Sequence, residues 1–152
     1  MSEDRIKKIL NESFFAYFCT TDGQKQPYIA PMFFIFDEES YKLYFVTRPK
    51  TRKVENIKSN PFASVTVDLR DPANPRNNEG VMVRGKINFF FPQDRWGGEG
   101  EKVKEIHGLY HKKYPTTVLE GIDVIASPEI IIELIPAQII HWKGSKFTKK
   151  EF

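Results

Sequence analysis

The chain has 152 residues, 40% of them hydrophobic and 14% aromatic, which favours a single folded domain over residues 1–152 and excludes a disordered chain. The chain has 23 Lys and Arg residues and 20 Asp and Glu residues. The resulting net charge of +3 is too small to indicate a nucleic-acid-binding protein. No apolar run is long enough for a membrane-spanning helix, and the polar N-terminus is unlike a signal sequence. The single cysteine, Cys19, excludes an intramolecular disulfide, so we expect a cytoplasmic protein.

The first part of the chain is predicted to form one helix and three strands. Residues 2–13 have the apolar spacing of an amphipathic helix. Three β-favouring runs follow, at residues 14–20, 25–36 and 41–47. The middle run contains Pro27 and Pro31, which cannot donate backbone hydrogen bonds and therefore favour an edge strand or a bulge.

The second part returns to extended structure around one more helix. Residues 62–69, 81–91 and 129–142 read as strands, and residues 101–114 as a helix that Pro115 ends. Gly85 and Pro136 lie inside two of these strands, where we expect a bulge and an interruption.

The order of these elements predicts the fold class. Short strands joined mainly by turns, with few helices, predict a mainly β protein: a closed or partly closed β-barrel with peripheral helices. A doubly wound fold is excluded because strands and helices do not alternate. The polar, basic tail at residues 143–152 is expected to be loose and solubilising.

A cluster of positive charge follows the third predicted strand. Residues 48–58 hold five cations and one anion, whereas the whole chain carries only +3. Thr51 is a good N-cap for a helix whose first turn contains Arg52 and Lys53. Cations are unfavourable at the positive end of a helix unless an anion offsets them, so a bound phosphate would explain this order. The alternative is an ordinary solvated face.

The segment resembles the FMN-binding split barrels related to pyridoxamine 5′-phosphate oxidase. The resemblance rests on "TRPKTRK" after a strand and "NIKSNPFASVTV" behind it, and extends from about Phe15 to about Phe89. In that family a Ser/Thr-Arg-Lys sequence at a helix start binds the FMN phosphate. A Thr four residues earlier ends a strand, and an Asn-Pro pair leads into the next strand. The matching residues are Thr47, Thr51, Arg52, Lys53, Asn60 and Pro61.

The resemblance implies a split β-barrel of the antiparallel Greek-key type that binds FMN, or alternatively a deazaflavin. Arg48 would add a cation to the phosphate site, and the backbone of Pro31, Met32 and Phe33 would face the flavin ring. Such proteins are usually homodimers with flavin at the subunit interface, so Trp142 would pack against the partner's flavin. Ordinary core packing is the alternative for Met32, Phe33 and Trp142.

Some residues depart from the oxidase pattern. Pro31 stands where those oxidases carry an Arg, and Gly80 where they carry a Gln; their late Arg-x-His is absent, the nearest His being His141. Pyridoxal phosphate synthesis is therefore not expected. The resemblance implies an oxidoreductase acting on an unknown small acceptor, a non-catalytic flavin binder or electron carrier, or a deazaflavin-dependent reductase. No catalytic residue is assigned; Arg84 would either steady negative charge or lie exposed on the outer face.

Other candidate sites are weaker. His107 and His111 have a metal-compatible i, i+4 spacing, but Gly108 stands where a zinc protease needs Glu, so we expect no metal site and surface or dimer-contact histidines. Cys19 is expected to be a buried, inert thiol. A flavin-free barrel that binds nucleic acid through residues 48–58 and the tail is the remaining alternative.

Overall fold

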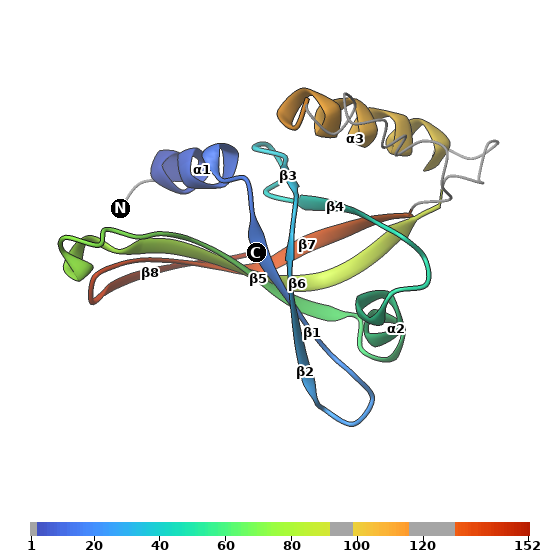
Figure 1. The fold of residues 1–152 in the computed structure, drawn as a ribbon, viewed down its shortest axis with the longest axis horizontal. Helices are drawn as coiled ribbons and strands as arrows, with labels where there is room; N and C mark the ends of the chain where they lie inside the picture. Colours follow the sequence, from blue (N-terminus) through green and yellow to red (C-terminus); the bar gives the residue numbers. More distant parts are fainter. Residues whose placement is uncertain (1–2, 92–98, 116–129) are drawn as a thin grey trace.

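The computed structural model describes residues 3–91, 99–115 and 130–152, which form one curled antiparallel sheet with helices around it (Figure 1). The helices are α1 (Glu3–Glu12), α2 (Arg52–Ser59) and α3 (Glu99–Lys113), with the 3-10 turn η1 (Pro75–Asn77). The strands are β1 (Ala16–Thr21), β2 (Pro27–Met32), β3 (Ile35–Phe36), β4 (Leu43–Thr47), β5 (Phe62–Leu69), β6 (Glu79–Phe90), β7 (Ile130–Lys143) and β8 (Lys146–Glu151). Their order is β2-β1-β5-β6-β7-β4-β3, with β8 paired to β7. The predicted mainly β, split-barrel class is confirmed as a curled half-barrel.

Strand β7 divides the sheet, because one of its edges changes partner along its length. Residues 130–134 pair with β4, whereas residues 138–143 pair with β8. Pro136 lies between the two segments, at a position where a backbone N–H is not needed. The strand is thus continuous, and the predicted interruption is wrong. At Pro136 the edge of β7 instead changes its partner from β4 to β8.

The bulge expected at Gly85 is present. Gly85 pairs with Pro136 and Arg84 with Gln138, so the register between β6 and β7 shifts by one residue at this point. A Cβ on Gly85 would lie 1.9 Å from the carbonyl oxygen of Ile135. Only glycine allows the two backbones to approach this closely.

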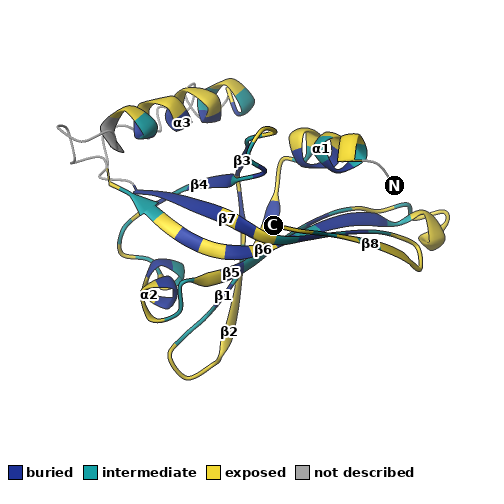
Figure 2. Ribbon diagram, turned by 180° about the vertical axis from the view of Figure 1, so that it is seen from behind, coloured by how far each residue is buried: buried dark blue, intermediate teal, exposed yellow. Residues whose placement is uncertain are grey.

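The main core lies on the inner face of the sheet. Alternate residues of β1, β5 and β6 point inward, as period-two strands require, and Figure 2 shows buried residues along β4, β6 and β7. Helix α1 covers this face with the three apolar residues that it buries, Ile6, Ile9 and Leu10. The helix predicted over residues 2–13 is therefore confirmed, and none of the described helices is long and apolar enough to cross a membrane.

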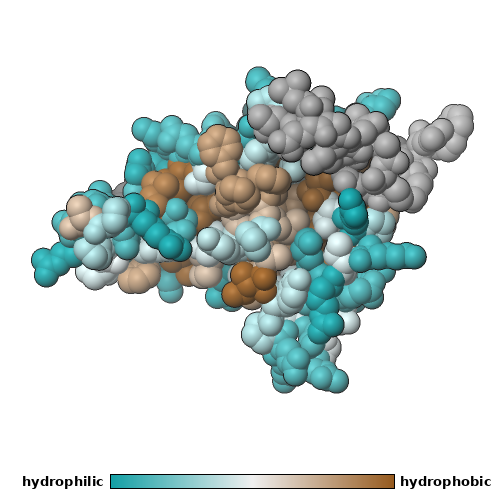
Figure 3. All heavy atoms as spheres, in the orientation of Figure 1, coloured by the Kyte–Doolittle hydropathy of each residue, from teal (hydrophilic) through white to brown (hydrophobic). Residues whose placement is uncertain are grey.

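The outer face of the sheet has two different halves. Over β3, β4 and the start of β7, helix α3 buries a second apolar cluster that includes Tyr44 and Ile131. Elsewhere the outward side chains of Tyr17, Phe62 and Phe147 are 42%, 60% and 65% exposed. Figure 3 shows apolar atoms exposed across the middle of the molecule, above the hydrophilic turn of the β1–β2 hairpin. One half of the outer face is thus packed, and the other is available for contact.

The expectation of a loose tail at residues 143–152 is wrong. Residues 146–151 form β8, which pairs in register with the end of β7. A two-residue turn at Gly144 and Ser145 closes the hairpin, with Gly144 at φ +57°. Lys150 also forms an ion pair with Glu3 of α1 at 2.6 Å. The polar composition reflects a strand that is solvated on its surface.

Candidate functional site

Helix α2 is attached to the end of β1 by neutral side chains. Asn56 Nδ2 donates to Thr20 Oγ1 at 3.1 Å, and both residues are buried. Asn60 Nδ2 donates to Thr21 Oγ1 at 2.6 Å, one residue beyond the end of the helix. Two hydrogen bonds of this kind resist sliding or rotation of the helix, so they fix where its N-terminus points.

The N-terminus of α2 has unused backbone donors. Thr51 is the N-cap, as predicted, but its side chain accepts no hydrogen bond from the first turn; its hydroxyl donates to the carbonyl of Arg48 at 3.3 Å. The first helical hydrogen bond runs from Glu55 N to Thr51 O at 3.1 Å. The N–H groups of residues 52–54 therefore have no partner within the helix and can receive an anion.

The side chains around these donors are cationic or hydroxylic. Thr47, at the end of β4, is only 7% exposed. Arg52 lies 3.8 Å from Asp22 in the β1–β2 turn, in a largely exposed and long ion pair. Lys53 is half-buried, burial lowers its pKa, and it has no ion pair among the described residues. A half-buried cation without an acid is the group that a bound phosphate would stabilise most.

The three residues expected beside the flavin ring have different surroundings. Pro31 is exposed and pairs with Tyr17, whereas the side chain of Met32 is buried in the main core. Phe33 is 36% exposed, and its ring centroid lies 4.9 Å from that of Phe15. Core packing thus applies to the side chain of Met32. Strand β2 ends the strand order, so its outer backbone edge has no strand partner in the described part of the chain.

Trp142 lies at the opposite end of the molecule from α2. It pairs with Gly80 and with Phe147 of β8, and Figure 1 shows β8 and α2 on opposite sides. A Cβ on Gly80 would lie 2.1 Å from Cζ2 of the indole, so the ring lies directly over the glycine. Within one chain, the fold therefore does not bring Trp142 to the cations of α2.

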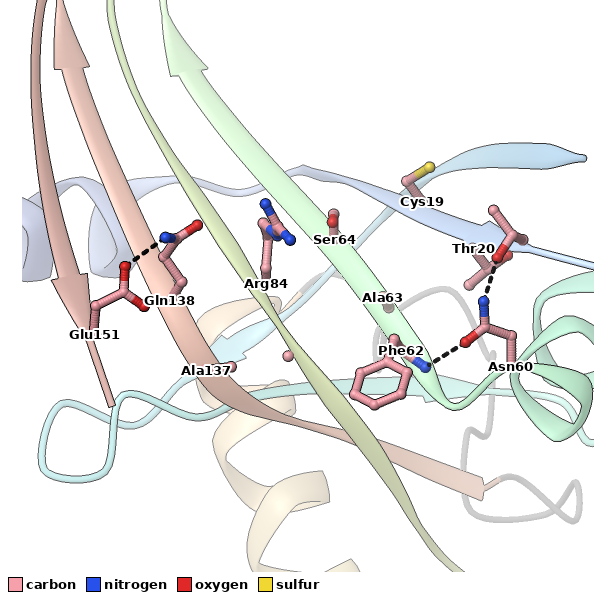
Figure 4. Close-up of a pocket in the computed structure, with 12 residues that line it drawn as sticks. Cys19, Thr20, Asn60, Phe62, Ala63, Ser64, Arg84, Ala137, Gln138 and Glu151 are labelled. Atoms are coloured by element: carbon pink, nitrogen blue, oxygen red, sulfur yellow. Dashed lines mark hydrogen bonds between the residues drawn. The ribbon is translucent and has the colours of Figure 1, made fainter. Parts of the chain in front are cut away.

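A pocket of about 520 Å³ lies on the open outer face, next to the C-terminal end of α2 (Figure 4). A row of residues in register across the strands lines it: Cys19, Ser64, Arg84, Gln138 and Glu151. Gln138 donates to Glu151 at 2.5 Å, while Arg84 has no ion pair within the described ranges. Cys19 is half-buried and lines this pocket, so the expectation of a fully buried thiol is wrong. Strand register was needed to find this row.

A partly buried charged group joins α1 to the sheet. Arg5 Nε donates to both carboxylate oxygens of Glu79 at 3.1 Å, and Glu79 lies 2.7 Å from Nε2 of His141, whose side chain is fully buried. The hydrogen bonds from Arg5, followed by that from His141, lower the pKa of Glu79 to about 2. No sequence pattern indicated this group, because its members come from separate elements.

One of the two histidines of α3 differs from the expectation of a surface residue. His107 is 8% exposed, so it is not a surface residue; burial, and then the neighbouring His111, lower its pKa. Their ring centroids lie 6.3 Å apart. Within the described ranges, no group of three or more His, Cys, Asp or Glu residues could hold a metal ion.

Comparison with known proteins agrees with this architecture. The family model for pyridoxamine 5′-phosphate oxidase matches residues 2–143. Protein Rv2991 from Mycobacterium tuberculosis has a similar structure, with 16% identity, a TM-score of 0.76, and coverage of 95% of this chain and 86% of that chain. A heme-binding protein from Mycobacterium smegmatis gives 10% identity and a TM-score of 0.76, covering 99% and 58% of the two chains.

A third similar structure is an F420 reductase, with 22% identity, a TM-score of 0.58, and coverage of 88% of this chain and 94% of that chain. A search of curated proteins finds no match. At these identities the solved structures support the fold alone, whereas the family model spans nearly the whole chain. The chain therefore belongs to the pyridoxamine 5′-phosphate oxidase family and has its split-barrel fold.

Proposed function

We propose that the chain binds FMN, with its phosphate at the N-terminus of α2, and acts as a flavin-dependent oxidoreductase on a small acceptor. The observation that carries the proposal is the set of N–H groups at residues 52–54 without a partner within the helix, next to the half-buried Lys53, which has no ion pair in the described part of the chain. A phosphate placed there would gain backbone donors, a helix dipole and charge-assisted hydrogen bonds together. When bound, FMN would supply hydride and electron transfer, which the protein's own side chains do not provide.

The residues of the site would hold and orient the cofactor. Lys53 and the first turn of α2 would bind the phosphate, with the Thr47 hydroxyl below and the Arg48 cation beside them. Arg52 would turn from Asp22 toward the ligand, because an exposed pair at 3.8 Å is weak. The outer backbone edge of β2 at Pro31 and Met32, together with the following Phe33, would lie along the ring.

A homodimer is part of the proposal. Trp142 is remote from α2 in its own chain, so it would contact only a flavin bound to a partner subunit. The exposed Tyr17, Phe62 and Phe147 on the open outer face supply apolar area for such an interface. We do not propose pyridoxamine 5′-phosphate oxidase activity, because Gly80 is covered by the indole of Trp142 and has no side-chain amide in the place of the expected Gln.

The test is a titration of the purified protein with FMN, followed by flavin fluorescence. We expect Lys53→Ala and Arg52→Ala each to weaken binding by roughly 10- to 150-fold, equivalent to about 1.5–3 kcal/mol. Lys58→Ala is the matched control, because Lys58 lies at the other end of α2 in an exposed pair with Glu55. Unchanged affinity in both test variants would rule out the phosphate assignment.

Assays of the purified protein with other ligands distinguish the alternative functions. Consumption of reduced nicotinamide by the FMN-loaded protein would support an enzyme, and tight binding without consumption would indicate a store or carrier. A deazaflavin would use the same phosphate donors. If the protein bound a deazaflavin more tightly than FMN, the deazaflavin would be the cofactor. If neither FMN nor a deazaflavin bound and the protein took up heme specifically, a heme-binding function like that of two similar structures would be favoured.

A further inference from the structure

A second group of cations lies where the β7–β8 turn meets η1. The concavity between them has a volume of about 850 Å³, within the usual range for small-molecule sites. Its lining consists of Pro75, Arg76, Lys143, Gly144, Ser145 and Lys146. Three of the six lining residues are cations, and none is acidic. The site adjoins the turn that precedes β8, so it lies away from α2 (Figure 1).

The two backbone segments that carry these cations are held together. The N–H of Gly144 donates to the carbonyl of Asn78 at 2.9 Å. A Cβ on Gly144 would lie 2.8 Å from the carbonyl oxygen of Arg76, and the residue has φ +57°, so glycine is required twice over. The N–H of Arg76 donates to Oδ1 of Asn74 at 3.2 Å. The positions of the cations therefore follow from a fixed contact between two turns.

Two acidic residues of the adjoining segments already have other partners. Glu79 stands opposite Lys143 in the strand register, but it is 4% exposed and bound to Arg5 and His141. Asp71 accepts three hydrogen bonds from its own loop, and these lower its pKa. Within the described ranges, no ion pair involves Arg76, Lys143 or Lys146. Among the residues that the structure describes, the three positive charges of the concavity therefore have no ion-pair partner.

We propose that this concavity is a second anion-binding site, for a free small molecule that carries a diphosphate group. Two lysines and one planar guanidinium suit an anion with two adjacent phosphates, and Ser145 adds a hydroxyl donor. A single-stranded nucleic acid is the less suitable occupant, because the lining has no aromatic side chain on which a base could stack. The proposal does not depend on flavin binding at α2.

The experiment is calorimetric titration of the full-length protein with pyrophosphate, in the presence of saturating FMN. We expect Lys143→Gln/Lys146→Gln to weaken binding at least about tenfold, and Arg76→Gln to weaken it by a similar factor. Affinity should also fall as salt is raised, because the groups are exposed. These exposed substitutions should leave the melting temperature unchanged, which separates lost binding from lost folding.

Two control variants fix the location. Lys149→Gln changes a cation of the same hairpin that lines a different groove, and Arg52→Gln/Lys53→Gln removes the cations at α2. Both should bind pyrophosphate within about twofold of the wild type. Loss of binding in the α2 variant, or no binding by the wild type at millimolar pyrophosphate, would overturn the proposal. So would a ten-nucleotide DNA strand that binds more tightly than pyrophosphate through the same lysines.

Discussion

Helices α1 and α2 are both attached to the sheet by polar side chains that contact a buried partner, but by different kinds of bond. Arg5 of α1 forms an ion pair with Glu79, which in turn contacts His141. Asn56 of α2 instead donates to a threonine hydroxyl, with no charge involved. Helix α1 therefore uses the cation of Arg5 for attachment, whereas in the first turn of α2 Arg52 forms only a long, exposed pair with Asp22 and Lys53 has no ion pair among the described residues.

Because of this difference, the charges of α1 contribute to stability, whereas those of α2 can contribute to binding. A charged attachment depends on protonation, because each partner is stabilised by the charge of the other. A neutral attachment holds α2 at any ordinary pH and leaves Lys53 without an acidic partner among the described residues. The first turn of α2 can then be unfavourable for the isolated protein and favourable once an anion binds, as expected of a functional site.

The largest effect that would test this comparison is expected from Glu79→Gln. The change removes the ion pair with Arg5 and leaves a buried imidazole with a weaker partner. Because the Arg5 side chain is partly exposed and can be solvated, the free energy of unfolding should fall by about 3 kcal/mol. Urea denaturation would measure the loss. The control Glu55→Gln, in an exposed pair with Lys58, should lose less than about 0.5 kcal/mol. Similar losses in the two variants would mean that α1 is not held by charge.

A smaller effect should appear as the pH is lowered. Because the pKa of Glu79 falls to about 2 on folding, its contribution is fully present above pH 4.5 and is lost as the pH falls toward 2. The wild type should lose about 2–3 kcal/mol in this interval that Glu79→Gln does not lose. Urea denaturation at pH 6, 4 and 3 would compare the two. Parallel losses would assign the acid sensitivity to other carboxylates.

The smallest effect concerns the neutral attachment. Asn56→Ala leaves the hydroxyl of Thr20 buried without its donor and should lower the free energy of unfolding by about 1–2 kcal/mol. Because no charge is involved, this loss should be the same at pH 4 and pH 7, measured by urea denaturation. Thr20→Val removes the other partner and is the matched variant. A loss that changes with pH would show that the two attachments do not differ in kind.

Local sequence signals predicted several elements well. Strand β5 has the predicted bounds, residues 62–69, because β-branched residues lie between clear turn signals. Thr51 is the N-cap of α2, and Gly85 marks a bulge, since capping and close backbone approach each require particular residue types. The hairpin of β8 was missed, because its lysines are polar in a strand that lies on the surface.

By itself, the sequence determined the mainly β class, the helix start at Thr51 and the cations that follow it, because these depend on neighbouring residues and on backbone sterics. Only the tertiary structure decided which distant residues meet. The contact of Glu79 with His141, the row that joins Ser64 to Arg84, and the approach of Gly144 to Arg76 all depend on strand register. Register is set by packing across the whole sheet. A shift of one residue would turn the strand side chains to the other face and would move the turn at Gly144 away from Arg76.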